Sequence, residues 1–230
     1  MSLEVVVLAG GFGTRLRPVV HDVPKPMAPV AGRPFLEIVL SRLARNGVRR
    51  VVLSIGHMAE TIVAHFGNHF AGMDLVYEVE DQPRGTGGAT ACAMRHVKER
   101  KALVLNGDTY LEFEVAALDQ AWVGVPIIVA RHVDDTSRYG RLEVEGTRVV
   151  GLAEKGIVGP GLINAGAYVL PFDFFAIRLP PVPFSLETDI LSAEISRRRV
   201  DVFISKGLFI DIGIPDDYQR AQGMGLGTRA

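Results

Sequence analysis

The sequence predicts an α/β protein whose mixed, mostly parallel sheet is flanked by helices. Short β-branched runs alternate with helical patterns through the first half of the chain, an order that gives parallel strands with helices on both faces. After Asp108 the strand-like runs follow one another with fewer helices between them, which indicates a partly antiparallel second half. Apolar residues make up 48% of the 230 positions, enough for a large core.

The first half contains four predicted strands and three predicted helices. A buried strand over residues 3–8 comes first. In the helix predicted over 35–46, apolar residues recur at helical spacing, and Gly47 supplies the stop signal. The other predicted elements are strands over 51–55, 75–79 and 102–106, and helices over 59–66 and 89–97.

The second half contains five predicted strands and two predicted helices. The strands lie over 127–130, 141–144, 149–153, 163–170 and 200–204, and the first helix over 187–197. Asp216 and Asp217 follow a proline and indicate the start of a final helix. We expect one domain over residues 1–222, in halves of about 1–110 and 111–222, with a frayed tail over 223–230.

The composition excludes several classes of protein. The formal net charge is −1, so no basic field supports nucleic-acid binding. Cys92 is the only cysteine, which rules out an internal disulfide and is compatible with a reducing cytosol. No apolar run approaches the roughly 20 residues that span a bilayer. We therefore expect a cytoplasmic protein that binds neither nucleic acid nor membrane.

The most informative segment is a glycine-rich turn, LAGGFGTRLRP over residues 8–18, followed by Lys25 between two prolines. Glycines let the backbone approach a ligand closely and point successive N–H groups at an anion. Arg15 can neutralise a polyphosphate as a planar fork and Lys25 as a compact charge. Pro24 and Pro26 place Lys25 on a stiff segment.

Two familiar phosphate-binding signatures fail on spacing. A dinucleotide fingerprint needs a third glycine where this chain has Leu16. A Walker A loop needs a glycine directly before a lysine, and this chain has none. The remaining alternative is a tight strand-to-helix turn with two solvated cations.

Two aspartates follow apolar strands and lie next to glycines. Asp108 ends the run Asn106-Gly107-Asp108, and Asp211 lies shortly before Gly213. Mg²⁺ prefers one or two carboxylates together with phosphate oxygens and water, so this pair could hold it. For Asp108 the alternative is an ordinary turn residue. The six histidines show no comparable metal-ligand spacing.

These motifs resemble those of the sugar-1-phosphate nucleotidylyltransferases, from the first strand to Tyr218. The resemblance implies the nucleotide-diphospho-sugar transferase fold, a Rossmann-like arrangement with a nucleotide-binding half followed by a sugar-phosphate half. It implies catalytic roles for Arg15 and Lys25, and Mg²⁺ ligation by Asp108 and Asp211. The implied nucleotide-binding residues are Leu8, Ala9, Gly10, Gly11, Gly13, Thr14, Arg15, Gln82, Thr86 and Gly87.

A second glycine-rich turn, residues 80–89, lies between the third predicted strand and the third predicted helix. Members of the family use this loop to hold the nucleotide base. Gln82, Thr86 and the backbone at Gly87 could then recognise a base edge by hydrogen bonding. The alternative is a plain helix N-terminus with Thr86 as the cap, and both interpretations can hold together.

The resemblance also implies a site for the sugar phosphate. Carboxylates and amides can fork onto neighbouring sugar hydroxyls, and a cation can hold the phosphate. Taken singly, Glu154 and Lys155 would be a solvated pair and Glu187 an exposed helix residue, but their order and spacing favour the functional interpretation. The implied residues are Asn106, Tyr139, Gly140, Glu154, Lys155, Asn164, Gly166 and Glu187.

The implied reaction is attack by the phosphate of a sugar 1-phosphate on the α-phosphorus of a nucleoside triphosphate, which releases pyrophosphate. Lys25 and Mg²⁺ would offset charge at the α-phosphate. Arg15 would hold the departing pyrophosphate, and Lys155 the incoming phosphate.

Within the family, the motifs are most similar to those of guanylyltransferases that join GTP to D-glycero-α-D-manno-heptose 1-phosphate. Mannose-1-phosphate guanylyltransferases and N-acetylmuramate-1-phosphate uridylyltransferases stay open as alternatives, because these residues alone do not separate guanine from uracil. A homodimer is also left open. A non-catalytic regulator that binds nucleotide sugars is the alternative from another class. It has no need of all four residues Arg15, Lys25, Asp108 and Asp211.

Overall fold

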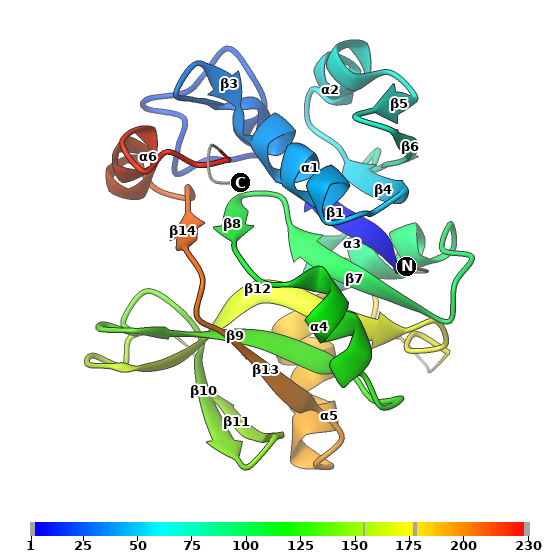
Figure 1. Cartoon of the computed structure of the whole chain (residues 1–230), viewed down its shortest axis with the longest axis vertical. Helices are drawn as coiled ribbons and strands as arrows, with labels where there is room; N and C mark the ends of the chain where they lie inside the picture. Colours follow the sequence, from blue (N-terminus) through cyan, green and yellow to red (C-terminus); the bar gives the residue numbers. More distant parts are fainter. Residues whose placement is uncertain (1–2, 154, 177–178, 228–230) are drawn as a thin grey trace.

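The structure is a computed structural model that describes residues 3–153, 155–176 and 179–227. One ten-stranded sheet crosses the molecule (Figure 1). In spatial order its strands are β10 (Arg141–Glu145), β11 (Arg148–Ala153), β13 (Asp201–Ser205), β9 (Ile127–Val133), β12 (Gly161–Pro171), β7 (Lys101–Asn106), β1 (Glu4–Ala9), β4 (Arg50–Ile55), β6 (Met73–Val79) and β5 (His69–Phe70).

The sheet is mixed, so the predicted α/β fold is confirmed. Strands β7, β1, β4 and β6 are parallel neighbours, and β9 and β13 form a second parallel pair. The long strand β12 pairs antiparallel with both β7 and β9 and so joins the two parallel groups. Parallel pairing dominates the first half of the chain, where the sequence alternates strands with helices.

Helices cover both faces of the sheet. On one face, α1 (Phe35–Arg45), α2 (Ala59–Phe66) and α4 (Val115–Ala121) pack with Val5 and Val7 of β1. On the other face, α3 (Gly85–Met94), the π-helical turn η2 (Leu186–Leu191) and α5 (Ser192–Ser196) pack with Val6. Successive side chains of a strand point to opposite faces, which is why one strand supplies both cores.

Two short ladders lie outside the large sheet. In one, β2 (Pro29–Val30) pairs with β3 (Arg33–Pro34). In the other, β8 (Thr109–Leu111) pairs antiparallel with β14 (Phe209–Asp211), which Figure 1 shows beside it. The sequence did not predict these ladders or α4, because segments of two to seven residues have little periodicity. The second ladder matters most, because it carries Asp211 next to Asp108.

Several predicted boundaries differ from the structure. Helix α3 begins at Gly85 rather than Ala89, because its glycines take part in the helix. The helix predicted over 187–197 is divided between η2 and α5. Residues 223–227, expected to fray, follow α6 (Pro215–Gln222) and pack on the domain. Leu226 is 5% exposed and belongs to the core that α1 covers.

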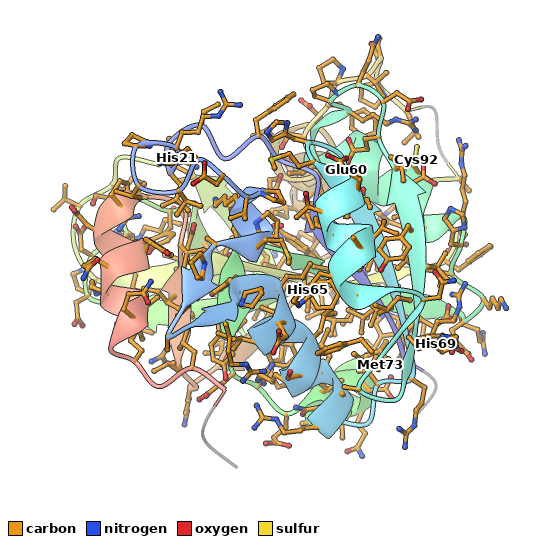
Figure 2. The ribbon with its side chains drawn as sticks, turned by 90° about the horizontal axis from the view of Figure 1, so that it is seen from above. His21, Glu60, His65, His69, Met73 and Cys92 are labelled. Atoms are coloured by element: carbon orange, nitrogen blue, oxygen red, sulfur yellow. The ribbon has the colours of Figure 1, made fainter. Side chains whose placement is uncertain are left out.

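Three further features concern the single cysteine, one pair of histidines and the possibility of a membrane-spanning helix. Cys92 is buried. His65 and His69, four positions apart, contact Glu37 and Asp74 respectively and do not converge (Figure 2). Within the described part of the chain, no helix has both the length and the apolar character needed to cross a membrane.

Candidate active site

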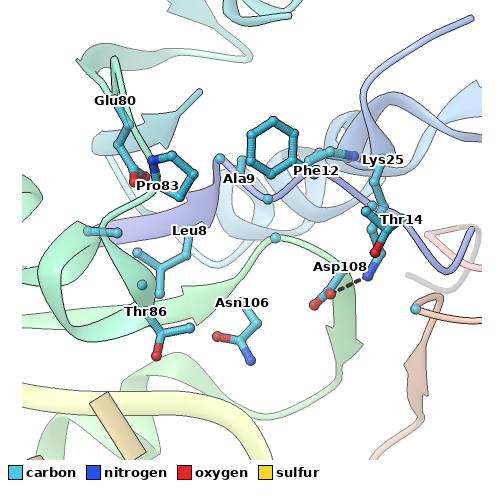
Figure 3. Close-up of a pocket in the computed structure, with 18 of the residues that line it drawn as sticks. Leu8, Ala9, Phe12, Thr14, Lys25, Glu80, Pro83, Thr86, Asn106 and Asp108 are labelled. Atoms are coloured by element: carbon cyan, nitrogen blue, oxygen red, sulfur yellow. Dashed lines mark hydrogen bonds and ion pairs between the residues drawn. The ribbon is translucent and has the colours of Figure 1, made fainter. Parts of the chain in front are cut away.

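A cleft of about 360 Å³ lies at the carboxyl ends of β1 and β7 (Figure 3). Its walls are the glycine-rich turn over residues 8–15, Lys25, Glu80 with residues 83–86 of the second turn, and residues 106–108. Ligands of open α/β sheets bind at this edge of the sheet. We refer to the cavity as the nucleotide-side cleft.

Gly107 lets β1 and β7 approach each other at the floor of this cleft. Its N–H donates to the carbonyl of Leu8 at 2.9 Å. A Cβ at Gly107 would lie 2.7 Å from that carbonyl oxygen, a separation that side chains do not adopt. Glycine is therefore required for the close contact that places Asp108 beside the glycine-rich turn.

Lys25 and Asp108 form an ion pair at the mouth of the cleft, marked in Figure 3. Lys25 lies in a 3₁₀ turn (Lys25–Met27) that Pro24 precedes. Its Nζ is 2.5 Å from Oδ2 of Asp108, and only 10% of its side chain is exposed. The stiff segment predicted from the two prolines thus places the largely buried ammonium group of Lys25 beside the Asp108 carboxylate.

Asp211 approaches the same point from β14. The ladder places it opposite Thr109, and the N–H of Ile212 donates to the carbonyl of Asp108 at 2.9 Å. Burial raises the pKa of Asp211, the negative charge of Asp108 raises it further, and Lys25 partly offsets both effects. The two aspartates are therefore close enough to interact electrostatically.

The aspartate pair fits a divalent cation whose coordination is completed by substrate. Two mutually repelling carboxylates gain from a shared positive ion, and Mg²⁺ commonly takes one or two carboxylates plus phosphate oxygens and water. The described residues contain no cluster of three or more His, Cys, Asp or Glu side chains suited to a metal. A site built only from protein ligands is thus not present in that part of the chain.

A second cavity, of about 720 Å³, adjoins the first and is called here the acceptor cavity. Arg15, Thr86, Asn106 and Asp108 line both cavities, so the two share a wall. Glu154 lies outside the described residues. Every other residue predicted to bind the sugar phosphate lines this cavity: Asn106, Tyr139, Gly140, Lys155, Asn164, Gly166 and Glu187.

A hydrogen-bond network orients the polar groups of the acceptor cavity. Oε1 of Glu187 accepts from the Tyr168 hydroxyl at 2.8 Å. Oε2 accepts from Thr86 Oγ1 at 2.7 Å and from Ser185 Oγ at 2.9 Å. Nδ2 of Asn164 donates to the Tyr168 hydroxyl at 2.9 Å. The two predicted sugar-binding groups, Asn164 and Glu187, are therefore joined through one buried tyrosine.

Tyr168 was not predicted, because it lies within an apolar run that reads as core strand. Its burial and the neighbouring charge of Glu187 raise its pKa well above the ordinary value, so it stays a neutral donor. The pairing of β12 with β9 shifts register between Asn164 and Ala167. Such bulges redirect side chains, and this one lies where Asn164 and Gly166 line the cavity.

The second glycine-rich turn is arranged differently from the prediction. Gln82 is exposed, and neither Gln82 nor Gly87 is among the described residues that line the two cavities. The N–H of Gly87 donates to the carbonyl of Phe184 at 3.0 Å, so it is occupied within the protein. Thr86 is not the helix cap, since Arg84 holds that position.

Glu80 is the main site residue that sequence analysis missed. It lines the nucleotide-side cleft directly after β6. Oε1 accepts from Ser54 Oγ at 3.0 Å and Oε2 accepts from the Arg84 N–H at 3.2 Å. A carboxylate has about four acceptor positions, and these hydrogen bonds within the described part of the chain occupy two of them. A carboxylate straight after an apolar strand was the available signal, the same one that identified Asp108.

Two adjoining cavities at the carboxyl edge of an α/β sheet define the class of this protein. One cavity has a glycine-rich anion loop, the other is lined by amide, hydroxyl and carboxylate groups, and a lysine and two aspartates stand where they meet. This is the geometry of an enzyme that brings a polyphosphate together with a second polar substrate.

The chain belongs to the nucleotidyl transferase family, whose profile matches residues 4–224. It is 36% identical over 223 residues to the D-glycero-alpha-D-manno-heptose 1-phosphate guanylyltransferase of Aneurinibacillus thermoaerophilus, which covers 96% of this chain and 97% of that protein. It is 35% identical to the protein of the same description from Campylobacter jejuni, covering 94% and 97%. The mannose-1-phosphate guanylyltransferase of Mycobacterium tuberculosis is 33% identical, covering 95% and 63%.

Solved structures agree with this assignment. HddC from Yersinia pseudotuberculosis superposes with a TM-score of 0.86 at 36% identity, covering 96% of this chain and 98% of that one. HddC complexed with GMP-PN superposes with a TM-score of 0.84 over the same shares of the two chains. The family and fold predicted from the motifs are thereby confirmed.

Proposed function

We propose that this protein transfers a guanylyl group from GTP to D-glycero-α-D-manno-heptose 1-phosphate, giving GDP-heptose and pyrophosphate. The observation that carries the transfer chemistry is the meeting of Lys25, Asp108 and Asp211 at the shared wall of two cavities. Two guanylyltransferases acting on this heptose phosphate are 36% and 35% identical to this chain, against 33% for the mannose-1-phosphate enzyme, which favours heptose.

The proposed reaction needs positioning and charge neutralisation more than proton transfer. The attacking sugar phosphate is already an anion, so no strong base is required. Lys25 would offset the charge that develops at the α-phosphate. The exposed Arg15 lines both cavities and would hold the departing pyrophosphate, and Lys155 lines the acceptor cavity and would hold the incoming phosphate.

Members of this family use a divalent metal, and we propose that Asp108 and Asp211 hold Mg²⁺ here. Bound there, the ion would supply additional positive charge next to the phosphates. The repulsion between the two carboxylates supports this assignment. The cytoplasmic location and the homodimer stay predictions of the sequence.

Glu80 supplies a physical reason for guanine as the base. The Watson–Crick edge of guanine presents two adjacent donors, N1–H and the 2-amino group, and carboxylates accept from base donors of this kind. The open acceptor positions of Glu80 match that pair. Uracil presents one donor between two carbonyl oxygens, which a carboxylate repels.

The proposed function is tested by a grid of substrates. The protein is incubated with Mg²⁺, each nucleoside triphosphate and a panel of sugar 1-phosphates that includes heptose, mannose and N-acetylmuramate, and pyrophosphate release is measured. We expect the highest kcat/KM for GTP with the heptose phosphate. A higher value for another pair would reassign the substrates. Binding of GDP-sugars without pyrophosphate release from any substrate pair would support the alternative of a non-catalytic regulator.

A further inference from the structure

Two loops that belong to different cavities are joined along their backbones. Residues 84–87 start α3 beside the nucleotide-side cleft, and residues 184–187 lead into η2 beside the acceptor cavity. The N–H of Phe184 donates to the carbonyl of Arg84 at 3.1 Å, and the N–H of Gly87 donates to the carbonyl of Phe184 at 3.0 Å. We call these two joined loops the clasp.

The clasp is packed too tightly for its halves to move separately. A Cβ at Gly87 would lie 2.4 Å from the ring of Phe184, and that ring is buried in the core. Close-packed groups transmit displacement because no free volume absorbs it. A ligand that fixes residues 84–87 therefore also fixes residues 184–187.

Thr86 carries this connection to the functional groups, because it lines both cavities. Its Oγ1 accepts from the N–H of Leu186 at 2.9 Å and donates its hydrogen to Oε2 of Glu187 at 2.7 Å. A hydroxyl has a single hydrogen, so Thr86 cannot donate to a nucleotide while it holds Glu187. Its side chain is thus directed to the acceptor side, although its backbone belongs to the nucleotide loop.

We propose that the clasp couples the binding of nucleotide and sugar phosphate, with Thr86 as the positioning residue for Glu187. The inference rests on the proposed function, which supplies the two ligands. A nucleotide in its cleft holds residues 84–87 in place, and Thr86 then holds Glu187 in the orientation that accepts sugar hydroxyls. By linkage, the sugar phosphate strengthens nucleotide binding by the same factor.

The coupling is measured by titrating D-glycero-α-D-manno-heptose 1-phosphate into the protein with Mg²⁺, without nucleotide and with a saturating GTP analogue. The analogue carries methylene in place of the α,β-bridging oxygen, so transfer cannot occur. For the wild-type protein we expect the analogue to raise the affinity for the sugar phosphate about fivefold or more.

Thr86→Val keeps the shape of the side chain and removes its hydroxyl. We expect this variant to reduce the affinity ratio to within about twofold of unity, while its affinity for the analogue alone changes less than about threefold. Thr86→Ser is the matched control, since it retains the hydroxyl and should retain the ratio. A Thr86→Val protein with the wild-type ratio would overturn the proposal.

A second measurement does not depend on the substrates. Hydrogen exchange of the Leu186 amide, which donates to Thr86, should be about tenfold or more faster in ligand-free Thr86→Val than in Thr86→Ser. Unchanged exchange contradicts the clasp. If exchange changes as expected but the wild-type protein binds neither ligand, the proposed substrates are wrong. The affinity ratio is then measured with the substrate pair that releases pyrophosphate in the grid of substrates. A ratio near one overturns the proposed coupling.

Discussion

The nucleotide-side cleft and the acceptor cavity are built in different ways. The cleft is lined mainly by two short glycine-rich turns, in which the backbone makes up much of the wall because glycine has no side chain. The acceptor cavity is lined by side chains from β12, from the loops that follow β7, β9 and β11, and from η2. A backbone-lined site is thus contained in a few contiguous residues, whereas a side-chain-lined site depends on the whole second half of the fold.

This difference predicts how each region responds to substitution. Single side-chain changes should act weakly on the cleft, except at the few charged groups it contains. In the acceptor cavity, a single side-chain change should alter the binding of one ligand and leave that of the other unchanged. The variants below test that separation, from the largest expected effect to the smallest.

Lys25→Ala should have the largest effect, because Lys25 stands where the two regions meet. We expect kcat to fall about 10²-fold to 10³-fold, since the lost charge is directed at the transition state. Steady-state kinetics measure the loss, and circular dichroism verifies the fold. Lys206→Ala, at an exposed position outside both cavities, should leave kcat unchanged. A folded Lys25→Ala enzyme with wild-type kcat would remove Lys25 from the mechanism.

Glu80→Gln should change the choice of nucleotide and leave the acceptor unaffected. A neutral amide loses the charge-assisted contacts to guanine, so we expect the preference for GTP over UTP in kcat/KM to fall roughly tenfold to 100-fold. The KM of the sugar phosphate should stay constant. Glu60→Gln, on the exposed face of α2, is the control. An unchanged preference would mean that the base is recognised elsewhere.

Glu187→Ala should produce the opposite pattern. Loss of a charge-assisted hydrogen bond worth about 1.5–3 kcal/mol raises the KM of the sugar 1-phosphate about tenfold or more, with little change for the nucleotide. Glu194→Ala, in the adjoining α5 and outside both cavities, should change neither constant. A shift confined to the nucleotide KM would show that the two cavities have been assigned the wrong way round.

The effect of Asp211→Asn on the stability of the metal-free protein should be the smallest of these effects. The raised pKa of Asp211 means that the folded protein binds this proton more tightly than the unfolded chain. The carboxylate therefore destabilises the metal-free fold at neutral pH, and this penalty disappears as pH falls through the raised pKa toward its ordinary value. Each 1 kcal/mol recovered raises Tm by about 2–4 °C in a chain of this size.

The measurement for Asp211→Asn is thermal unfolding at pH 7 and at about pH 4, near the ordinary aspartate pKa, with the exposed Asp216→Asn as control. The gain in Tm should be present at pH 7 and smaller at the acid pH. Addition of Mg²⁺ with GTP should stabilise the wild type more than the variant, because the variant retains only one carboxylate. A Tm of Asp211→Asn below that of the wild type at pH 7 would contradict the prediction that the Asp211 carboxylate destabilises the fold.

The same difference explains how far the sequence allowed prediction. The glycine-rich turn and Asp108 follow strands with strong patterns, and two prolines flank Lys25, so these residues were identified from local sequence alone. Asn164 and Glu187 were identified by a family resemblance and lie in one cavity, but Tyr168, which joins them, was hidden in an apolar run. The hydrogen bond from the Gly87 N–H to the Phe184 carbonyl joins two loops that are distant in the sequence, so no local pattern could predict it.

The ladder between β8 and β14 has a consequence for the timing of activity during synthesis. Asp108 leaves the ribosome together with almost all residues that line the nucleotide-side cleft, about 100 residues before Asp211. Domains fold as units while the chain is being extended. A growing chain can therefore shape its nucleotide loop before it can assemble the carboxylate pair, and a chain that stops short of β14 has no second carboxylate. The two aspartates proposed to hold the metal therefore meet only after β14 has docked on β8.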